Sequence, residues 1–352
     1  MPLKLVRIRD FRCIEQAELT LSRQRTYIYG PNGAGKTSLL EAAYLLGRGR
    51  SFRTRHNRLL VRHGQVGMAV YGEVQRNGGH HRLGLQLGES GLETRVDGST
   101  SGGVAALARL LPINVIEPNI HQLIEGAPST RRRFLDWGVF HVERRFLEDW
   151  QRYRRVLGQR NAGLKLGQDT SIWDTGLVEA GEAVHAARRR YFELLEKTVA
   201  ELGVSLVGQP IQLSYRGGWA AEIPLAEALR RSRQRDRHLA STQVGPHRAD
   251  LRVAVGDRAV REAASRGQQK LVAAAMVVGQ TRVFADAHGD AGTLLVDDPA
   301  AELDSGSFRR LMDVLDGLPA QLIMTGLSEA TLPPAGGFPV FHVEQGKVSP
   351  VL

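Results

Sequence analysis

The sequence predicts an α/β fold interrupted by an inserted, mainly helical segment, with no long coiled coil. Near the N-terminus, a glycine-rich loop lies between the short apolar run Tyr27-Ile28-Tyr29 and a segment of helical periodicity over residues 35–47. Near the C-terminus, residues 293–297 and 321–325 each read as a buried parallel strand, because their apolar residues follow one another without alternation. In the middle of the chain, apolar residues recur every three or four positions, which indicates helices.

Further strands and one helix complete the α/β portions. Apolar residues alternate with polar ones at residues 19–21 and again over 66–97, where Asn77-Gly78-Gly79 predicts a turn between short strands. A strand is expected over 251–255, and a helix over 268–287. We expect the two α/β portions to form one domain into which the helical middle is inserted.

The helical middle predicts an antiparallel pair of helices that is too short for a coiled-coil arm. The first apolar face comprises Val142, Phe146, Trp150, Tyr153 and Leu157, and the second comprises Leu177, Ala180, Val184, Ala187, Tyr191 and Leu194. The opposite faces carry the arginine clusters 131–133, 144–145, 154–155 and 188–190. These clusters are interpreted either as solvated helix faces or as a basic surface that contacts phosphates.

Composition limits the class of protein. The 352 residues carry a formal net charge of +10, which favours polyanionic partners, although arginine-rich usage can also reflect a GC-rich genome. No apolar run approaches the ~20 residues of a membrane-spanning helix, and the N-terminus lacks the apolar stretch of a secretory signal. Cys13 is the single cysteine, which excludes an internal disulfide and a cysteine-based zinc site. We therefore expect a cytoplasmic protein with no membrane partner.

The glycine-rich loop matches the phosphate-binding pattern GxxxxGK[ST] at every required position. It consists of Gly30, Pro31, Asn32, Gly33, Ala34, Gly35, Lys36 and Thr37. Glycines allow the backbone N–H groups to turn towards a β-phosphate, and the following helix directs its positive dipole end at the same anion. Lys36 is expected to reach the β- and γ-phosphates of ATP, and the Thr37 hydroxyl to bind Mg²⁺.

A second motif lies at the end of a predicted strand, in Leu294-Leu295-Val296-Asp297-Asp298. An apolar strand that ends in two acids is the expected Walker B partner of the phosphate-binding loop. Asp297 would hold Mg²⁺, directly or through water, and Asp298 would polarise the attacking water. Strands also end in aspartate because this residue favours turns. The functional interpretation of the motif therefore depends on the phosphate-binding loop upstream.

A third motif, Ala264-Ser265-Arg266-Gly267-Gln268-Gln269-Lys270, opens a predicted helix about thirty residues before the acid pair. Such a helix N-terminus can bind a second phosphate, and Ser265, Gly267 and Gln268 are the candidate contacts. The alternative is an ordinary helix N-terminus with Ser265 as its cap.

Together these motifs resemble the ATPase heads of the ABC and SMC class, and within that class the RecF family of bacterial DNA replication and repair proteins. The family motifs are Asp10-Phe11-Arg12, residues 30–37 and 40–42, Gly49-Arg50-Ser51-Phe52-Arg53, residues 131–136, Gln159-Arg160-Asn161, Gly245-Pro246-His247-Arg248, Ser265–Gln269 and Asp297–Asp304. The chain departs from the family pattern at Ala249, at residues 116–120 near the expected Q-loop, and at Lys270. Thr325 stands where many ABC ATPases have a switch histidine.

The resemblance implies a head domain of residues 1–116 plus 241–352 and an arm domain of residues 117–240. It implies an ATP-dependent homodimer in which Ser265 and Gly267 of one copy contact the γ-phosphate held by the other. It also implies binding to double-stranded and gapped or single-stranded DNA at junctions. Cooperation with RecR and RecO in loading RecA, homologous recombination and a part in the SOS response to DNA damage follow from the same resemblance.

ATP turnover is expected to be slow, because the aspartate at position 298 is one methylene shorter than the glutamate common in ABC transporters. Other functions stay open from the sequence. An ABC-type ATPase subunit acting on a non-DNA partner would use the same motifs. A small-molecule P-loop kinase would need no signature motif, and an ATP-binding scaffold would need no useful hydrolysis.

Overall fold

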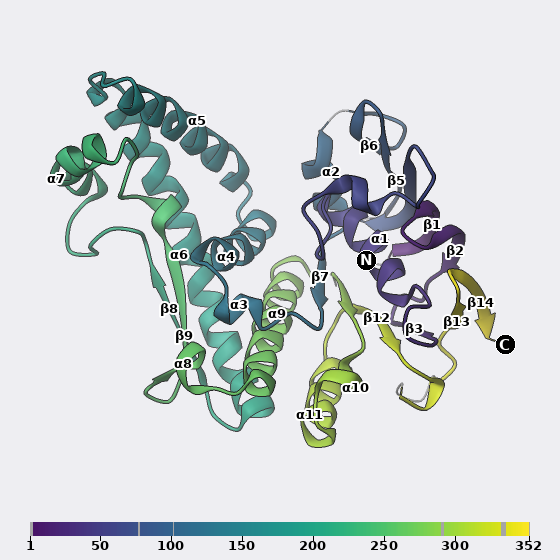
Figure 1. The fold of residues 1–352 in the computed structure, drawn as a ribbon. Coiled ribbons are helices and arrows are strands. Elements are labelled where there is room, and N and C mark those ends of the chain that lie inside the picture. Colours follow the sequence, from purple (N-terminus) through teal and green to yellow (C-terminus); the bar gives the residue numbers. More distant parts are fainter. Residues whose placement is uncertain (1–2, 77, 101, 290–291, 332–335, 352) are drawn as a thin grey trace. The chain divides into compact units, whose positions relative to one another are not determined.

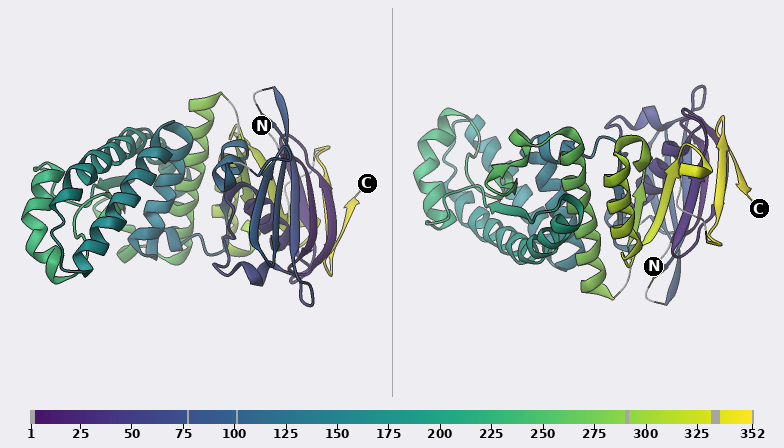
Figure 2. Two further views of the ribbon diagram at one scale, coloured as in Figure 1. Left: turned by 90° about the horizontal axis from the view of Figure 1, so that it is seen from above. Right: turned by 90° about the horizontal axis from the view of Figure 1, so that it is seen from below.

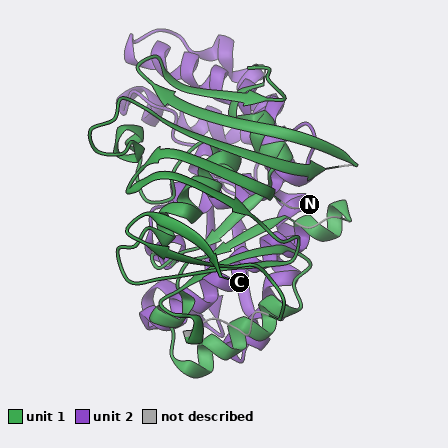
Figure 3. Ribbon diagram, turned by 90° about the vertical axis from the view of Figure 1, so that its right-hand side faces the viewer, with its two compact units in different colours: residues 1–120, 284–352 green, residues 121–283 purple. Residues whose placement is uncertain are grey.

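A computed structural model describes residues 3–76, 78–100, 102–289, 292–331 and 336–351 of the chain. The chain divides into two compact units, unit 1 with residues 1–120 and 284–352 and unit 2 with residues 121–283 (Figure 3). The predicted arm, residues 117–240, lies in unit 2 apart from its first residues. Residues 241–283, which the sequence assigns to the head, also belong to unit 2 by compactness.

The central sheet of unit 1 has the strand order β14-β13-β3-β12-β11-β7 (Figure 1). Its strands are β3 (Arg25–Tyr29), β7 (Ile113–Ile116), β11 (Thr293–Val296), β12 (Gln321–Gly326), β13 (Val340–Glu344) and β14 (Lys347–Val351). Neighbouring strands pair in parallel, except β13 and β14. Every residue of β11 and β12 is buried, which confirms the two strands predicted from continuous apolar runs.

A second sheet of unit 1 is antiparallel, with the order β2-β1-β4-β5-β6, and Figure 2 shows its long strands side by side. Its strands are β1 (Leu3–Phe11), β2 (Ile14–Thr20), β4 (Met68–Arg76), β5 (Gly79–Gly88) and β6 (Gly91–Val96). The strands predicted over 66–97 are confirmed. Arg76 pairs with Gly79 across the predicted turn, of which Asn77 lies outside the described residues.

Helix α1 (Lys36–Arg48) contacts both sheets of unit 1 and is almost entirely buried, so its side chains join the two sheets in one hydrophobic core. It ends at Gly49, whose left-handed backbone lets the N–H bond the carbonyl of Leu45. The remaining helical elements of unit 1 are α2 (Gly103–Leu110), α10 (Pro299–Glu302), α11 (Ser305–Asp316) and the 3-10 turns η1 (Asn57–Leu60) and η4 (Glu329–Thr331).

Unit 2 is mainly helical. Its elements are α3 (Gln122–Glu125), α4 (Pro128–Val142), α5 (Phe146–Lys165), α6 (Asp174–Val207), α7 (Leu225–His238), α8 (Val260–Ala263), the 3-10 turns η2 (Ser171–Trp173) and η3 (Pro246–Arg248), and α9 (Arg266–His288), within which unit 1 resumes. Ion pairs Arg152–Glu179 and Arg160–Asp174 show that α5 and α6 run antiparallel, as predicted (Figure 1).

The single helix expected through Val142 and Leu157 is wrong at its start. Helix α4 ends at Val142, Glu143 is extended, and α5 begins at Phe146. Phe146 on α5 is also buried, so the spacing of apolar residues continues across this break. The spacing therefore indicates which residues are buried and not that the helix is continuous.

Unit 2 also contains a small antiparallel sheet of order β10-β9-β8, formed by β8 (Ile211–Arg216), β9 (Asp250–Val255) and β10 (Arg258–Ala259). The strand predicted over 251–255 is therefore confirmed as β9. Its partners lie in unit 2 rather than in the central sheet of unit 1.

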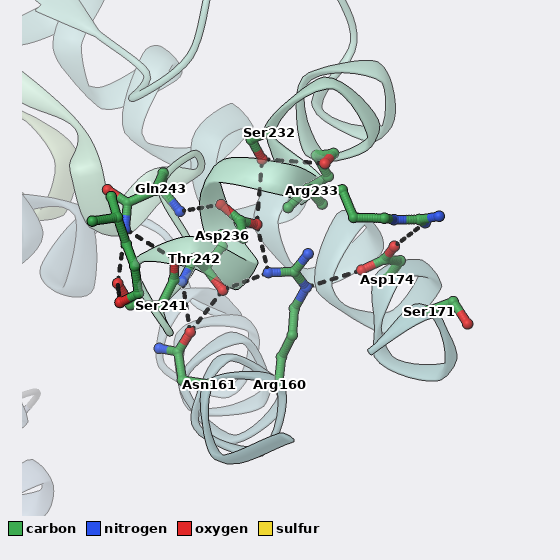
Figure 4. A network of polar contacts seen from close by, with 12 residues as sticks. Arg160, Asn161, Ser171, Asp174, Ser232, Arg233, Asp236, Ser241, Thr242 and Gln243 are labelled. Carbon is green, nitrogen blue, oxygen red and sulfur yellow. Dashed lines mark hydrogen bonds and ion pairs between the residues drawn. The ribbon is translucent and has the colours of Figure 1, made fainter. Parts of the chain in front are cut away.

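A buried polar network joins α5, α6 and α7 to the segment before η3 (Figure 4). The guanidinium of Arg160, which has no exposed surface, donates to Asp174 at 2.9 Å, to Asp236 at 2.8 Å and to Thr242 at 2.8 Å. Asn161 accepts from the backbone N–H and the hydroxyl of Thr242. The motif Gln159-Arg160-Asn161 thus fixes the loop that leads to Gly245-Pro246-His247-Arg248.

Among the described residues, no helix combines the length and the hydropathy needed to span a membrane.

Candidate nucleotide-binding site

The phosphate-binding loop runs from the end of β3 to the first residue of α1, as the sequence predicts. Two of its glycines are required by geometry. A Cβ on Gly30 would lie 2.1 Å from the carbonyl oxygen of Val343, so no larger residue fits there. Gly35 caps α1 with φ 116°, a backbone conformation that other residues rarely adopt. Glycine at these two positions therefore lets the backbone turn tightly into the first residue of α1.

Lys36 is folded back over the loop. Its ammonium donates to the carbonyl of Gly30 at 2.7 Å and to that of Pro31 at 3.1 Å, and the residue is 6% exposed. Burial lowers the pKa of Lys36, while the charges of Asp298 and Asp297 act in the opposite direction. Phosphate oxygens would replace two neutral carbonyl acceptors by charged ones, and charge-assisted hydrogen bonds are the stronger kind.

The two predicted metal ligands meet in space although 260 positions separate them. The Thr37 hydroxyl lies 2.9 Å and 3.1 Å from the two carboxylate oxygens of Asp297. Asp297 also accepts from the hydroxyl of Thr325 at 2.8 Å, and burial raises its pKa. The parallel pairing of β11 with β12, and of β12 with β3, brings these strand ends together.

This donor set suits Mg²⁺. A hydroxyl and a buried carboxylate supply hard oxygen ligands, and a cation beside Asp297 would offset the cost of burying its charge. Within the described residues, no cluster of three or more acidic, histidine or cysteine side chains could hold a metal alone. Mg²⁺ usually takes one or two protein ligands and completes its shell with water and phosphate.

Asp298 directly follows the metal-ligand candidate and stands at the N-terminus of α10. Its backbone is left-handed, with φ 47° and ψ 55°, and its N–H donates to the Thr325 hydroxyl at 3.0 Å. Thr325, at the position of the switch histidine, therefore holds both acids of the motif. Residues in such backbone conformations concentrate at functional sites.

A cavity of about 280 Å³ gathers these groups within unit 1. It is lined by Asn32, Gly33, Ala34, Gly35, Lys36, Thr37, Ser38, Asp297 and Asp298, together with Cys13 and Arg53. Sequence reasoning assigned no nucleotide role to Cys13 or Arg53. Arg53 belongs to the family motif at residues 49–53, and that motif is the sequence signal that points to this position.

A fully buried carboxylate organises the wall that carries Arg53. Glu41 on α1 receives two hydrogen bonds from Arg12, at 2.9 Å and 2.7 Å, and a short one from the Ser51 hydroxyl. Arg53 lies 3.7 Å from the same carboxylate. Three family motifs, around Arg12, Glu41 and Ser51, therefore converge beside the loop.

Glu117 directly follows β7, in the segment that the resemblance predicts to lie near the Q-loop. Ile116 pairs with Val296, so Glu117 and Asp297 leave neighbouring parallel strands at the same edge. Burial, and after it the charge of Asp297, raise the pKa of Glu117 to about 7. This acid was not assigned a role from the sequence, because its closeness to Asp297 depends on strand order.

The third predicted motif, at the start of α9, lies in unit 2. Ser265, Gly267 and Gln268 are exposed at the start of α9. The Ser265 hydroxyl accepts from the N–H of Gln268 at 3.3 Å, and the Gln268 side chain accepts from the N–H of Ser265 at 3.0 Å. Ser265 thus caps the helix, as the alternative interpretation predicts. Its exposure leaves the phosphate-contact prediction open.

Two arginines expected on a solvated helix face are buried, so that prediction is wrong for them. Arg131 pairs with both carboxylate oxygens of Asp250, at 2.8 Å and 3.1 Å. Arg188 pairs with Asp136 at 2.7 Å and 2.9 Å. Each cluster spans more than one side of its helix, so one member points inward where a carboxylate can neutralise it. Others, such as Arg154 and Arg155, are exposed.

Comparisons with known proteins cover nearly the whole chain. A family model described as RecF/RecN/SMC N terminal domain matches residues 2–348. A relative from Pseudomonas fluorescens (strain Pf0-1), named DNA replication and repair protein RecF, is 38% identical over 99% of this chain and 98% of its own. A relative of the same name from Pseudomonas putida (strain KT2440) is 39% identical over the same shares.

Solved structures agree in fold. One described as the recombination mediator protein RecF-ATP in the RecFOR pathway has a TM-score of 0.89 at 24% identity, covering 99% of this chain and 97% of that one. An Smc head bound to the C-winged helix domain of ScpA has a TM-score of 0.63 at 17% identity, covering 100% and 97%.

Proposed function

Because this chain belongs to the RecF family of DNA replication and repair proteins, with an ABC/SMC-type ATPase fold, we propose that it is an ATP-dependent DNA-binding protein of recombinational repair. The observation that carries the proposal is the Thr37–Asp297 contact, which brings the phosphate-binding loop and the Walker B motif into one cavity. Mg²⁺ bound there would neutralise phosphate charge. The chain's own groups then position the nucleotide, with Lys36 donating to its phosphates and Asp298 orienting the attacking water.

The cavity holds one half of the proposed site, and a second copy of the chain supplies the other. Ser265, Gly267 and Gln268 present exposed polar groups at the N-terminus of a long helix, a position suited to anions. ATP would thus join two copies through a twofold axis, and slow hydrolysis would release them. In this proposal, residues 1–116 plus 241–352 act as the head and residues 117–240 as the arm.

The proposed setting is the bacterial cytoplasm, at single-strand/double-strand junctions and gaps in DNA. The relatives' name and the fold class support this role, together with the net charge of +10. RecR and RecO are the proposed protein partners, and loading of RecA at gaps is the proposed outcome. One described structure places a protein of this fold in the RecFOR pathway.

Light scattering of the purified protein with Mg²⁺, with and without ATP and duplex DNA, tests the proposal. We expect dimers that form with ATP and retain DNA in the native protein and in the control Lys347→Met, whose lysine is exposed on β14. Lys36→Met should stay monomeric. A protein that stays monomeric with ATP, does not bind DNA and phosphorylates a small molecule would instead be a kinase. In a separate ATPase assay, turnover of many ATP per second without DNA would refute the proposed slow hydrolysis.

Asp298→Asn separates a hydrolytic switch from a scaffold. If Asp298 serves hydrolysis, the asparagine variant should bind ATP and form dimers that persist longer than those of the native protein. An unchanged dimer lifetime would favour a scaffold that binds ATP without using its hydrolysis.

DNA contacts by the arm are tested with exposed arginines, because replacing Arg131 would break a buried ion pair. Arg154→Gln combined with Arg155→Gln should lower the slope of log affinity against log salt by about 0.9 per lost phosphate contact. The matched control is Arg152→Gln on the same helix, since Arg152 is exposed but engaged with Glu179. An unchanged slope in the double variant would remove this face from the proposed DNA surface.

A further inference from the structure

Unit 2 carries a groove of about 1150 Å³ between α6 and the segment that joins β8 to α7. Its volume exceeds the roughly 300–1,000 Å³ typical of small-molecule sites, so an extended peptide segment would fit. The groove belongs to neither the nucleotide cavity nor the exposed arginines of α5.

The floor of the groove is a connected set of aromatic rings. The ring of His185 lies 5.5 Å from that of Tyr215 and 4.6 Å from that of Trp219, and Phe192 lies 6.0 Å from Tyr215. The indole N–H of Trp219 donates to the carbonyl of Ile223 at 3.2 Å, which fixes the ring. Burial, followed by the charges of Arg189 and Arg188, lowers the pKa of His185.

The chain is shaped to bring these rings together. A Cβ on Gly217 would lie 2.7 Å from the His185 ring, so only glycine lets the segment approach α6 this closely. Gly218 has φ +97°, and a Cβ there would lie 2.1 Å from the carbonyl oxygen of Gly245. The groove wall is therefore a built feature of the fold rather than a gap left by a loose loop.

The rim is acidic, in a chain whose net charge is +10. Among the described residues that line the groove, four glutamates stand against two arginines, which leaves a net charge of −2: Glu182, Glu193, Glu196 and Glu222 against Arg189 and Arg216. Arg189 lies 3.8 Å from Glu193. Within the described part of the chain, Glu182, Glu196 and Glu222 make no ion pair, so their charges are available to an incoming cation.

We propose that this groove docks an arginine- or lysine-rich segment of a protein partner. Aromatic faces attract guanidinium and ammonium groups, and the surrounding carboxylates pair with the same cations. The same carboxylates repel phosphates, which sets the groove apart from a nucleic-acid surface. The charge of the groove is opposite to the net charge of the molecule, so a basic partner would be attracted to this groove more strongly than to the molecule as a whole. The inference needs neither ATP nor DNA.

Fluorescence anisotropy tests the proposal with the full-length chain, without nucleotide. The probe is a labelled peptide that alternates glycine with four arginines, and its counterpart carries glutamate in place of arginine. We expect the arginine peptide to bind and the glutamate peptide not to bind. Glu196→Gln combined with Glu222→Gln should weaken that binding about fivefold, and Trp219→Ala by a similar factor, while Trp219→Phe retains most of it. The matched control, Glu201→Gln, removes an exposed charge of α6 outside the groove and should change nothing.

Three results would overturn the proposal. The first is equal binding of the arginine peptide to the native protein and the double glutamine variant, or no preference for it over the glutamate peptide. The second is a single-stranded oligonucleotide that loses affinity on Trp219→Ala while the arginine peptide does not, which would assign the groove to nucleic acid. The third is a nucleotide-free dimer that dissociates in the double variant, which would make a second copy of this chain the occupant. Circular dichroism confirms that each variant is folded.

Discussion

Replacing Arg160 by methionine should destabilise unit 2 far more than any exposed arginine replacement. The variant keeps an apolar stem of similar length but leaves Asp236, which has no exposed surface, without its cation. Asp236 retains the N–H of Gln243 at 2.9 Å and the Ser232 hydroxyl at 3.3 Å, and Asp174 retains Arg233 at 3.0 Å. The main effect is therefore the loss of the Arg160–Asp236 ion pair, which leaves one buried carboxylate without a cation. Breaking a buried ion pair in this way costs about 3–5 kcal/mol of stability.

The measurement is urea unfolding followed by tryptophan fluorescence. All four tryptophans, at positions 137, 150, 173 and 219, lie in unit 2, so the signal reports the unfolding of that unit. Arg152→Met on the same helix is the control. Its partner Glu179 and Arg152 itself are more than half exposed, and such pairs contribute ~0.2–1 kcal/mol.

A double variant decides whether the buried charge is the cause. Adding Asp236→Asn to Arg160→Met removes the unpaired carboxylate and should recover about 1–3 kcal/mol of the loss. The reasoning is refuted if Arg160→Met costs no more than Arg152→Met. It is also refuted if the asparagine makes the protein less stable still.

Three further predictions concern unit 1. Thr37→Val should weaken ATP binding in the presence of Mg²⁺ about tenfold or more, while Thr37→Ser retains it. Titration calorimetry with Mg²⁺ and with EDTA measures both affinities. An equal loss of affinity in EDTA would show that Thr37 does not act through the metal. Gly30→Ala should destabilise unit 1 by about 1–3 kcal/mol, because the added methyl group clashes with Val343. The expected result is a lower midpoint of unfolding, followed by circular dichroism. An unchanged midpoint of unfolding would show that the loop can move away from Val343. Glu117, with its pKa raised from 4.5 to about 7, keeps a proton in the folded state that the unfolded state releases, so its contribution to stability falls as pH rises from about 4.5 to 7. The nucleotide-free Glu117→Gln variant should therefore gain stability over the native protein by up to about 3 kcal/mol between pH 5 and pH 8; a constant difference would contradict the raised pKa.

Local sequence was sufficient for the phosphate-binding loop and for most elements around it. The pattern over Gly30–Thr37 depends on backbone freedom and on one lysine and one hydroxyl, all within eight positions. The strands at 293–297 and 321–325 were predicted because a strand covered on both faces must be apolar throughout. The break between Val142 and Phe146 was missed, since residues before and after it bury their apolar sides alike.

Pairings between distant residues were decided by the tertiary structure alone. Thr37 reaches Asp297 because β3, β12 and β11 are parallel neighbours, an order that no local pattern encodes. The same order places Glu117 beside Asp297. Arginine clusters look alike in sequence, yet Arg131 is buried against Asp250 while Arg155 is exposed, because burial of a charge depends on whether a carboxylate faces it.

The sequence by itself thus determined the candidate nucleotide-binding groups, which are a phosphate-binding loop, an acid pair and a third motif at fixed local spacing. The folded chain determined which of those groups share a cavity, which arginines are exposed to solvent, and where four glutamates gather around an aromatic groove. The physical reason is that covalent spacing sets local conformation, whereas strand order and packing set the distances over which charges and metal ligands act.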